Sequence, residues 1–219
     1  MKGFRSYGRL LAALLCVFLF ASCGGNNYIK QVKNGRMNFD QSTTIGKALS
    51  GYSYITAGKW SSSKDSQGRQ LVSFTARAKD PYAIIFHTPK GDIDVKTRDD
   101  LFVNFIGFYG LSGSEAELKE LGMDKNFLNT VYERYYEVYE YYDEKPHDEA
   151  FFVPASAVLE LQWLILGKKE DGTRLNDQTL TVTFKLPQMD NKTLDVPIPI
   201  GLETMLKMIY GNKSYIETR

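Results

Sequence analysis

The first 22 residues differ in pattern from everything that follows. They open with three basic side chains, those of Lys2, Arg5 and Arg9. An apolar run of 11 residues then extends from Leu10 to Phe20, ahead of small residues and Cys23. That length is typical of a secretory signal peptide, with its roughly 7–15 apolar residues, and is shorter than the roughly 20 of a membrane-spanning helix. We therefore expect residues 1–22 to be a signal peptide that is removed, so that they take no part in the fold.

The four residues Phe20-Ala21-Ser22-Cys23 resemble the lipobox of bacterial lipoproteins. In that family small side chains before the cysteine fit the signal peptidase, the chain is cut before the cysteine, and its thiol and new amino group are acylated. The resemblance implies that Cys23 carries fatty acyl chains such as palmitate and anchors the mature protein to a membrane of the bacterial cell envelope. The alternative is an ordinary secretory signal followed by an incidental cysteine.

Loss of the signal peptide constrains how the remainder can fold. Cys16 leaves with it, so the mature chain has no second cysteine and no intramolecular disulfide. It keeps 197 of the 219 residues, with 24 basic and 26 acidic side chains. A chain of this length buries about 70% of its unfolded surface, so an apolar core can support the fold. A formal charge of −2 argues against a nucleic-acid partner, which needs a clustered basic surface.

Residues 23–29 are expected to be a lipidated cysteine and a flexible tether, because Gly24-Gly25-Asn26-Asn27 has the composition of a linker. No Asp follows Cys23, and in enteric-type lipoproteins such an Asp retains the protein in the inner membrane. There is also no acidic run of the kind that accompanies some surface export. By this resemblance we expect the outer membrane, with the protein facing the periplasm.

The sequence pattern of residues 30–219 predicts one α+β domain. Helical patterns occupy 45–50, a segment of about 114–145 and 201–210; strand patterns occupy 54–60, 70–78, 82–87, 157–166, 179–186 and 194–200. Residues 100–109 fit either a strand or a buried helix. The strands are joined mostly by short turns, such as Asp65-Ser66-Gln67-Gly68 and Asp190-Asn191, which favours antiparallel pairing. We predict a mainly antiparallel sheet packed against a central helical segment and short flanking helices.

The region from 32 to 78 resembles a group of small exported bacterial lipoproteins with no assigned activity. The motifs that carry the resemblance are V-x-N-G at 32–35, T-x-G-x-A at 44–48, K-W at 59–60 and the strand around Val72 and Phe74. An apolar strand at 159–165 fits the same group. The resemblance implies export and an α+β fold, and it supplies no catalytic residue.

The predicted helical segment is rich in tyrosine. Six of the 14 tyrosines lie between residues 132 and 142. Tyr132, Tyr136 and Tyr139 form a stripe beside the apolar face that contains Leu128, Val131 and Tyr135. This stripe is a candidate binding face for a protein, peptide or glycan, because tyrosine suits half-wet interfaces. The alternative is that the helix packs on the sheet while the hydroxyl groups reach solvent.

No metal, cofactor or catalytic site is expected. The mature chain has two histidines, His87 and His147, and no free thiol, which disfavours a closed zinc site. The acidic loop 143–149 has oxygen ligands for calcium but lacks the spacing of a calcium loop, and is expected to be solvated. Asp99-Asp100 is likewise expected to be solvated at a strand start, and Gly110 to Ser114 departs from the nucleophile-elbow spacing.

The leading hypothesis is a lipid-anchored, non-enzymatic periplasmic module that binds a protein or peptide, by strand addition or through the tyrosine stripe. One alternative is an envelope hydrolase acting on a glycan or peptide, which predicts acids or a Ser–His pair that converge from distant segments. Another is an inhibitor of a periplasmic partner. The expected contacts are the membrane, through the anchor, and an envelope protein or peptide.

Overall fold

The computed structural model describes residues 22–86, 94–112, 125–140, 150–166, 173–198 and 200–218. Several sequence predictions concern residues outside these ranges. They are the signal peptide up to residue 21, the capping pair Ser114 and Glu117, the acidic loop 143–149, and both histidines. These remain predictions.

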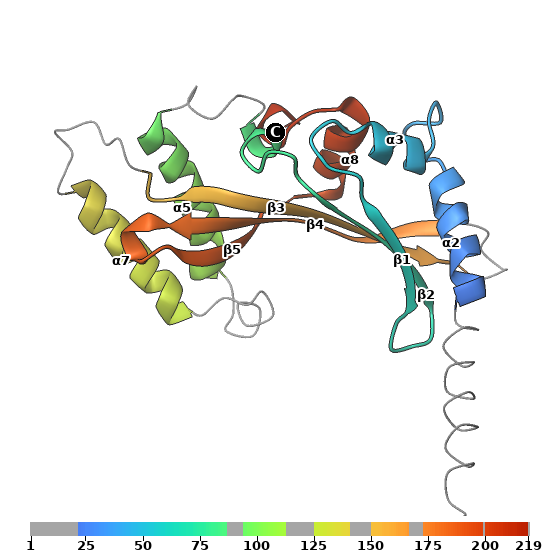
Figure 1. Ribbon diagram of the computed structural model, residues 1–219, viewed down its shortest axis with the longest axis horizontal. Helices are drawn as coiled ribbons and strands as arrows, with labels where there is room; N and C mark the ends of the chain where they lie inside the picture. The colour runs from blue at the N-terminus through green and yellow to red at the C-terminus, as the bar shows by residue number, and fades with distance from the viewer. Residues whose placement is uncertain are drawn as a thin grey trace, which may run out of the picture. The chain divides into compact units, whose positions relative to one another are not determined.

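Five strands form one antiparallel sheet in the order β1-β2-β3-β4-β5, so strands that are consecutive in the chain are neighbours in the sheet (Figure 1). The strands are β1 (Lys59–Lys64), β2 (Gln70–Arg77), β3 (Val153–Ile165), β4 (Thr173–Leu186) and β5 (Lys192–Ile198). The described helices are α2 (Ser22–Asn34), α3 (Ile45–Gly51), α4 (Ala83–Phe86), α5 (Val95–Ser112), α7 (Lys125–Glu140) and α8 (Leu202–Gly211), with 3-10 turns η1 (Pro187–Met189) and η2 (Ile216–Thr218). The predicted α+β class is confirmed.

The chain divides into two compact units. The first unit comprises the residues up to Ser50, then Lys59–Phe74 and Leu161–Asp177. The second unit comprises Gly51–Gly58, Thr75–Glu160 and Gln178–Arg219. Strands β2, β3 and β4 therefore each contribute residues to both units.

The β1–β2 hairpin of the first unit is closed by Asp65. Its Oδ1 atom accepts the backbone N–H groups of Gln67 at 2.9 Å and Arg69 at 2.8 Å. Gly68 has a φ of 76°, in the left-handed region that glycine adopts without steric cost. The turn predicted at residues 65–68 is therefore confirmed, and its chemistry is that of an Asx turn with glycine at the left-handed position.

Helix α2 packs against α3 and β1 within the first unit. Val32 on α2 and Ile45 on α3 are buried. A Cβ atom at Gly46 would lie only 3.0 Å from the carbonyl oxygen of Lys33, so a larger residue here would push α3 and the α2 backbone apart by a few tenths of an ångström. The N–H of Ile45 also donates to the carbonyl of Gly35 at 2.9 Å, which ties the two helices together.

The helix over Ser22–Asn34 corrects the expectation of a flexible tether at residues 23–29. Glycine and asparagine are poor helix formers in isolation. Most helical stability in proteins comes from packing of an apolar face, and here Val32 is buried while α2 contacts β1. In α2, packing of the last turns against the fold therefore outweighs the low helix propensity of the residues in the first turns.

Strands β4 and β5 build much of the second unit's core. Their register places Phe184 opposite Leu194 and Val182 opposite Val196, and all four side chains are buried. The intervening threonines are half-buried, which confirms the alternation predicted for 179–186. Asp190-Asn191 forms the predicted turn, and both residues have a φ of 55°.

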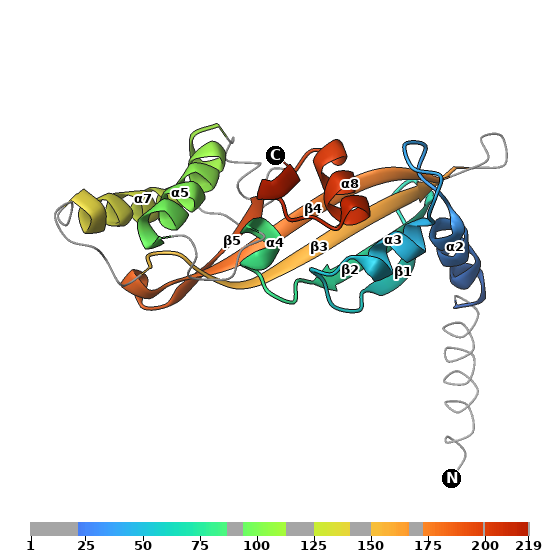
Figure 2. The ribbon, with the colours of Figure 1, turned by 90° about the horizontal axis from the view of Figure 1, so that it is seen from above.

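The predicted C-terminal helix is confirmed as α8 and is tied to the segment before β1. Asn212 ends α8 in the left-handed conformation, and its Oδ1 atom accepts both the N–H and the hydroxyl of Ser53 at 2.8 Å. The Tyr52 hydroxyl donates to the carbonyl of Lys213 at 2.9 Å. Downstream, the N–H of Tyr215 donates to the carbonyl of Ile84, so η2 lies beside α4 (Figure 2).

The strand predicted at 82–87 is wrong: Ala83–Phe86 is the short helix α4. Asp80 determines this, because its Oδ1 atom accepts the N–H groups of Tyr82 at 2.8 Å and Ala83 at 3.2 Å. An Asp-Pro pair is a strong helix start, with Asp as the cap and Pro81 at the first helical position.

The ambiguous segment 100–109 is helical, as part of α5. Asp94 begins this helix: one carboxylate oxygen accepts the N–H of Thr97 at 2.9 Å and the other accepts its hydroxyl. These bonds, led by the hydroxyl, lower the pKa of Asp94. An Asp cap ahead of the segment is the local feature that favours a helix over a strand here.

Candidate functional site

Helix α7 carries the tyrosine stripe and lies beside α5 in the second unit (Figures 1 and 2). Leu128, Val131 and Tyr135 are buried, which confirms the predicted apolar face in the part of α7 whose side chains are described. The Tyr135 hydroxyl donates to the carboxylate of Asp100, and its ring meets Phe151 edge-on at 5.6 Å between centroids. Tyr135 thus fixes the rotation of α7 and determines which side chains face away from α5.

Tyr136 and Tyr132 lie on the neighbouring face of α7. The Tyr136 side chain is 49% exposed and Tyr132 is half-buried. Their rings are stacked, 6.4 Å apart with an interplanar angle of 18°. The Tyr132 hydroxyl donates to the carbonyl of Val103 on α5 at 3.0 Å, which holds that ring in place. The third predicted member, Tyr139, has a side chain outside the described part of the chain.

Burial, followed by the neighbouring Tyr136, raises the pKa of Tyr132 to about 12. The unfolded value is near 10. The fold therefore favours the neutral hydroxyl, and this contribution to stability is complete below pH 10 and is lost as the pH rises through about 12.

We predict that alkaline titration will detect this group. The tyrosinate absorbance of the wild type minus that of Tyr132→Phe should have its midpoint near pH 12, because only Tyr132 is removed from the sum. Circular dichroism at each pH identifies any unfolding. A difference curve centred near pH 10 would contradict the buried, hydrogen-bonded placement of Tyr132.

Asp99 is buried, contrary to the expectation of a solvated residue at a strand start. It is 0% exposed on α5, and its two oxygens accept the N–H groups of Phe151 at 2.7 Å and Phe152 at 3.1 Å. Asp99 precedes Phe102 and Val103 by three and four residues, so all three share the buried face of the helix. That periodicity was the available sequence signal. Asp99 holds the chain where it enters β3.

Arg98 is a second buried charge that sequence reasoning missed. It is 4% exposed, and its guanidinium carbon lies 5.8 Å from the centre of the Tyr82 ring, within range of a cation–π contact. Its Nε atom is buried without a hydrogen-bond partner among the described residues. The three consecutive charged residues 98–100 thus each have a contact within the fold. Arg98 lies over an aromatic ring, and the carboxylates of Asp99 and Asp100 accept hydrogen bonds.

An aromatic cluster in the first unit joins α2 to β1. Trp60 stacks on Trp163 with 5.5 Å between ring centroids and contacts Phe74 at 4.9 Å. The Lys33 ammonium lies 5.2 Å from the Trp60 ring centre. Because Trp163 and Phe74 are buried, the cluster is part of the packing of the first unit. The contact between Lys33 and Trp60 links α2 to it.

Within the described ranges, no three His, Cys, Asp or Glu side chains gather in a way that could hold a metal ion. No described helix is long and apolar enough to cross a membrane. Cys23 itself lies in the first turn of α2.

Comparisons with protein-family models, with curated proteins and with solved structures gave no match to this chain. The resemblance to exported lipoproteins thus remains a prediction.

Proposed function

We propose that this chain is a lipid-anchored protein of the bacterial cell envelope, attached through Cys23 to the outer membrane and facing the periplasm. We further propose that it is a non-enzymatic module that binds a protein or peptide through Tyr132 and Tyr136. The observation that carries the binding role is the exposure of Tyr136, 49%, on a ring that is stacked on a fixed neighbour.

A preorganised aromatic pair suits a binding role. Tyr132 is held by its hydrogen bond to Val103, so ordering it on binding costs little side-chain entropy. Tyrosine combines a large apolar surface with a polar tip and is enriched at the residues that dominate binding energy. Charged side chains flank the pair, including the exposed ion pair between Arg134 and Glu137 at 2.8 Å. An aromatic centre with a polar rim is the usual composition of a protein–protein interface.

The sheet edges favour this face over strand addition. Strand β5 is short and contains Pro197, which has no N–H to donate to an added strand. Strand β1, at the other edge, is contacted by α2. Protected edges of this kind disfavour the pairing of a further strand.

The hydrogen bonds of Asp99 and Asp100 support a binding role rather than a hydrolase, because both carboxylates are already engaged within the fold. Asp99 is engaged by two backbone N–H groups, and Asp100 accepts the Tyr135 hydroxyl. Asp100 links α5 to α7, and Asp99 links α5 to the segment before β3, which supports a structural role for this acidic pair.

We expect Tyr136→Ala to reduce recovery of the partner in an envelope crosslinking pull-down by about tenfold or more, as for a central interface aromatic. Leu202→Ala is the matched control, because Leu202 is 44% exposed in the same unit but lies on α8. Thermal unfolding verifies that both variants are folded. If Tyr136→Ala and Leu202→Ala recovered the same proteins in the same amounts as the wild type, the binding role of the stripe would be wrong.

A further inference from the structure

The two units carry opposite charge. From residue 23 onward, the first unit has 10 basic and 5 acidic side chains, a formal charge of +5. The second unit has 14 basic and 21 acidic side chains, a formal charge of −7. The near-neutral total of the mature chain therefore conceals a basic unit that begins at the anchor residue and an acidic unit that follows it. Charge segregation of this size matters for association with charged surfaces.

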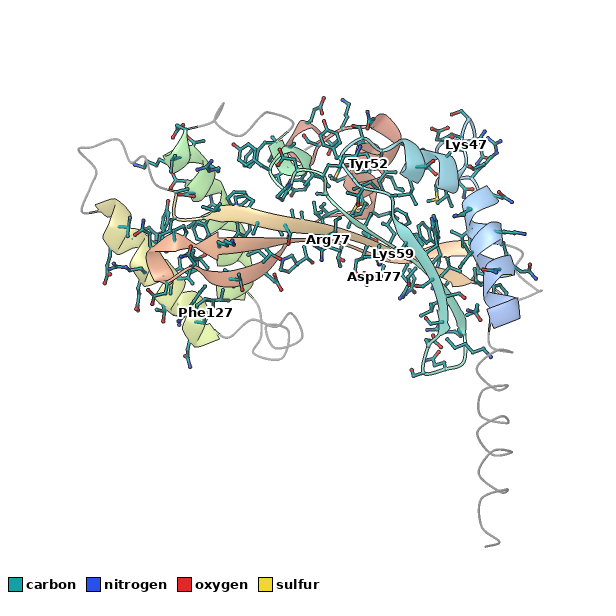
Figure 3. All side chains as sticks on the ribbon, in the orientation of Figure 1. Lys47, Tyr52, Lys59, Arg77, Phe127 and Asp177 are labelled. Atoms are coloured by element: carbon teal, nitrogen blue, oxygen red, sulfur yellow. The ribbon has the colours of Figure 1, made fainter. Side chains whose placement is uncertain are left out.

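The excess positive charge of the first unit is accessible. Four lysines on three elements are exposed: Lys30 on α2, Lys47 on α3, and Lys59 and Lys64 on β1 (Lys47 and Lys59 are labelled in Figure 3). We call these four side chains the basic cluster. They are distributed around the unit rather than on one face, since Lys64 lies on the same face of β1 as Trp60 and Lys59 lies on the opposite face. The three elements are in contact, since α2 packs on β1 and α3 approaches α2 at Gly46.

The acidic side chains of this unit are few, and two are engaged locally. Asp65 pairs with Arg69 at 2.6 Å in the hairpin turn. Asp40 accepts the hydroxyl of Ser42 at 2.6 Å and its N–H at 2.8 Å, and these bonds lower the pKa of Asp40. Neither carboxylate is paired with the basic cluster in these contacts.

The anchor residue is in helical continuity with this basic unit. Helix α2 runs without a break from Ser22 to Asn34, so no irregular spacer separates Cys23 from the fold. Lys30 is seven residues after Cys23, a rise of about 10 Å along a helix axis. The electrostatic screening length at physiological ionic strength is about 8 Å. Because the rise exceeds one screening length, Lys30 is strongly attracted to the headgroups only when α2 lies along the surface of a membrane that holds acyl chains at Cys23.

We propose that the excess positive charge of the first unit, carried by the basic cluster, attracts this unit to an anionic phospholipid surface, so that the anchor and the lysines together hold it at the bilayer. The inference rests on the proposed lipid anchor at Cys23. Several acyl chains already give stable attachment. The lysines therefore contribute orientation: the basic unit is attracted to anionic headgroups, whereas the acidic second unit, which carries Tyr136, is not.

The test uses the mature chain from residue 23 with Cys23→Ser, so that headgroup affinity is measured without acyl chains. The protein is sedimented with vesicles of phosphatidylcholine alone or mixed with phosphatidylglycerol, at rising salt. We expect binding to the anionic vesicles only, and a decline as salt screens the charges. The variant with Lys30, Lys47, Lys59 and Lys64 all changed to Gln should bind at least about tenfold more weakly.

The matched control changes four exposed lysines of the second unit, Lys79, Lys96, Lys125 and Lys185, to Gln. It removes the same formal charge and should alter vesicle binding by less than about twofold. Equal losses in the two variants, salt-independent binding, or no binding to phosphatidylglycerol would each overturn the proposal. If the protein failed to bind phosphatidylglycerol but was retained on an acidic protein, the basic cluster would be a binding site for a macromolecule instead of a membrane.

The outcome is separable from that of the proposed function. Incorporation of labelled palmitate into the intact protein, abolished by Cys23→Ser, tests the anchor. The Tyr136→Ala pull-down tests the binding role. The vesicle measurement depends on neither, because it uses a chain without lipid and without a partner.

Discussion

Replacing Asp99 with alanine is expected to lower the free energy of unfolding by about 2–6 kcal/mol, because two buried donors lose their acceptor at about 1–3 kcal/mol each. The donors are the N–H groups of Phe151 and Phe152, 52 and 53 residues further along the chain. Asp99→Asn keeps one acceptor oxygen and should lose less. Urea denaturation followed by tryptophan fluorescence and circular dichroism measures both.

Asp100→Asn is the matched control for Asp99. It lies on the same helix, is exposed, and its amide oxygen can still accept the Tyr135 hydroxyl. A change within about 0.5 kcal/mol is expected, as for most surface substitutions. Should Asp99→Ala prove no more costly than Asp100→Asn, the assignment of Asp99 as the buried clamp between α5 and the start of β3 would be contradicted.

Phe184→Ala should cost about 3–5 kcal/mol, the usual loss when a buried phenylalanine is truncated and leaves a cavity. Phe184 is fully buried on β4. Its ring centroid lies 4.4 Å from that of Phe102 and 6.0 Å from that of Phe152. The substitution therefore removes contacts to α5 and to the segment before β3 at once, and the loss should appear in chemical denaturation.

Phe39→Ala provides the comparison for Phe184→Ala, since it is the same chemical change at a side chain that is 55% exposed. It should cost less than about 1 kcal/mol. Similar midpoints of unfolding for the two variants would show that Phe184 is not at the centre of the core.

Local patterns predicted the parts of the fold that depend on local chemistry. The period-two alternation of β4, the Asp65 to Gly68 turn and the apolar face of α7 each follow from neighbouring residues. Helix α4 differs from the strand predicted at 82–87 because Asp80 and Pro81 begin a helix, and the apolar run that follows them fits either kind of element. Helix α2 was missed because packing on β1 is a property of the folded unit, which the composition of residues 24–27 does not reveal.

The candidate site was predictable only in part. Tyrosine on a helix face next to an apolar face predicted an accessible ring, and Tyr136 is exposed. Which of the tyrosines turns inward depends on Asp100 and Phe151, which belong to other elements. The burial of Asp99 depends on a contact made 52 residues away, and no local pattern specifies that partner.

The most direct test of the proposed function is site-specific photocrosslinking in intact cells that make the full, lipidated protein. A photoreactive phenylalanine analogue is placed at Tyr136 in one strain and at Leu202 in another, because both positions are exposed in the second unit. The proposed binding role predicts a discrete envelope protein or peptide adduct at position 136 and none at position 202. The same pattern of adducts at both positions, or none at 136, would contradict it.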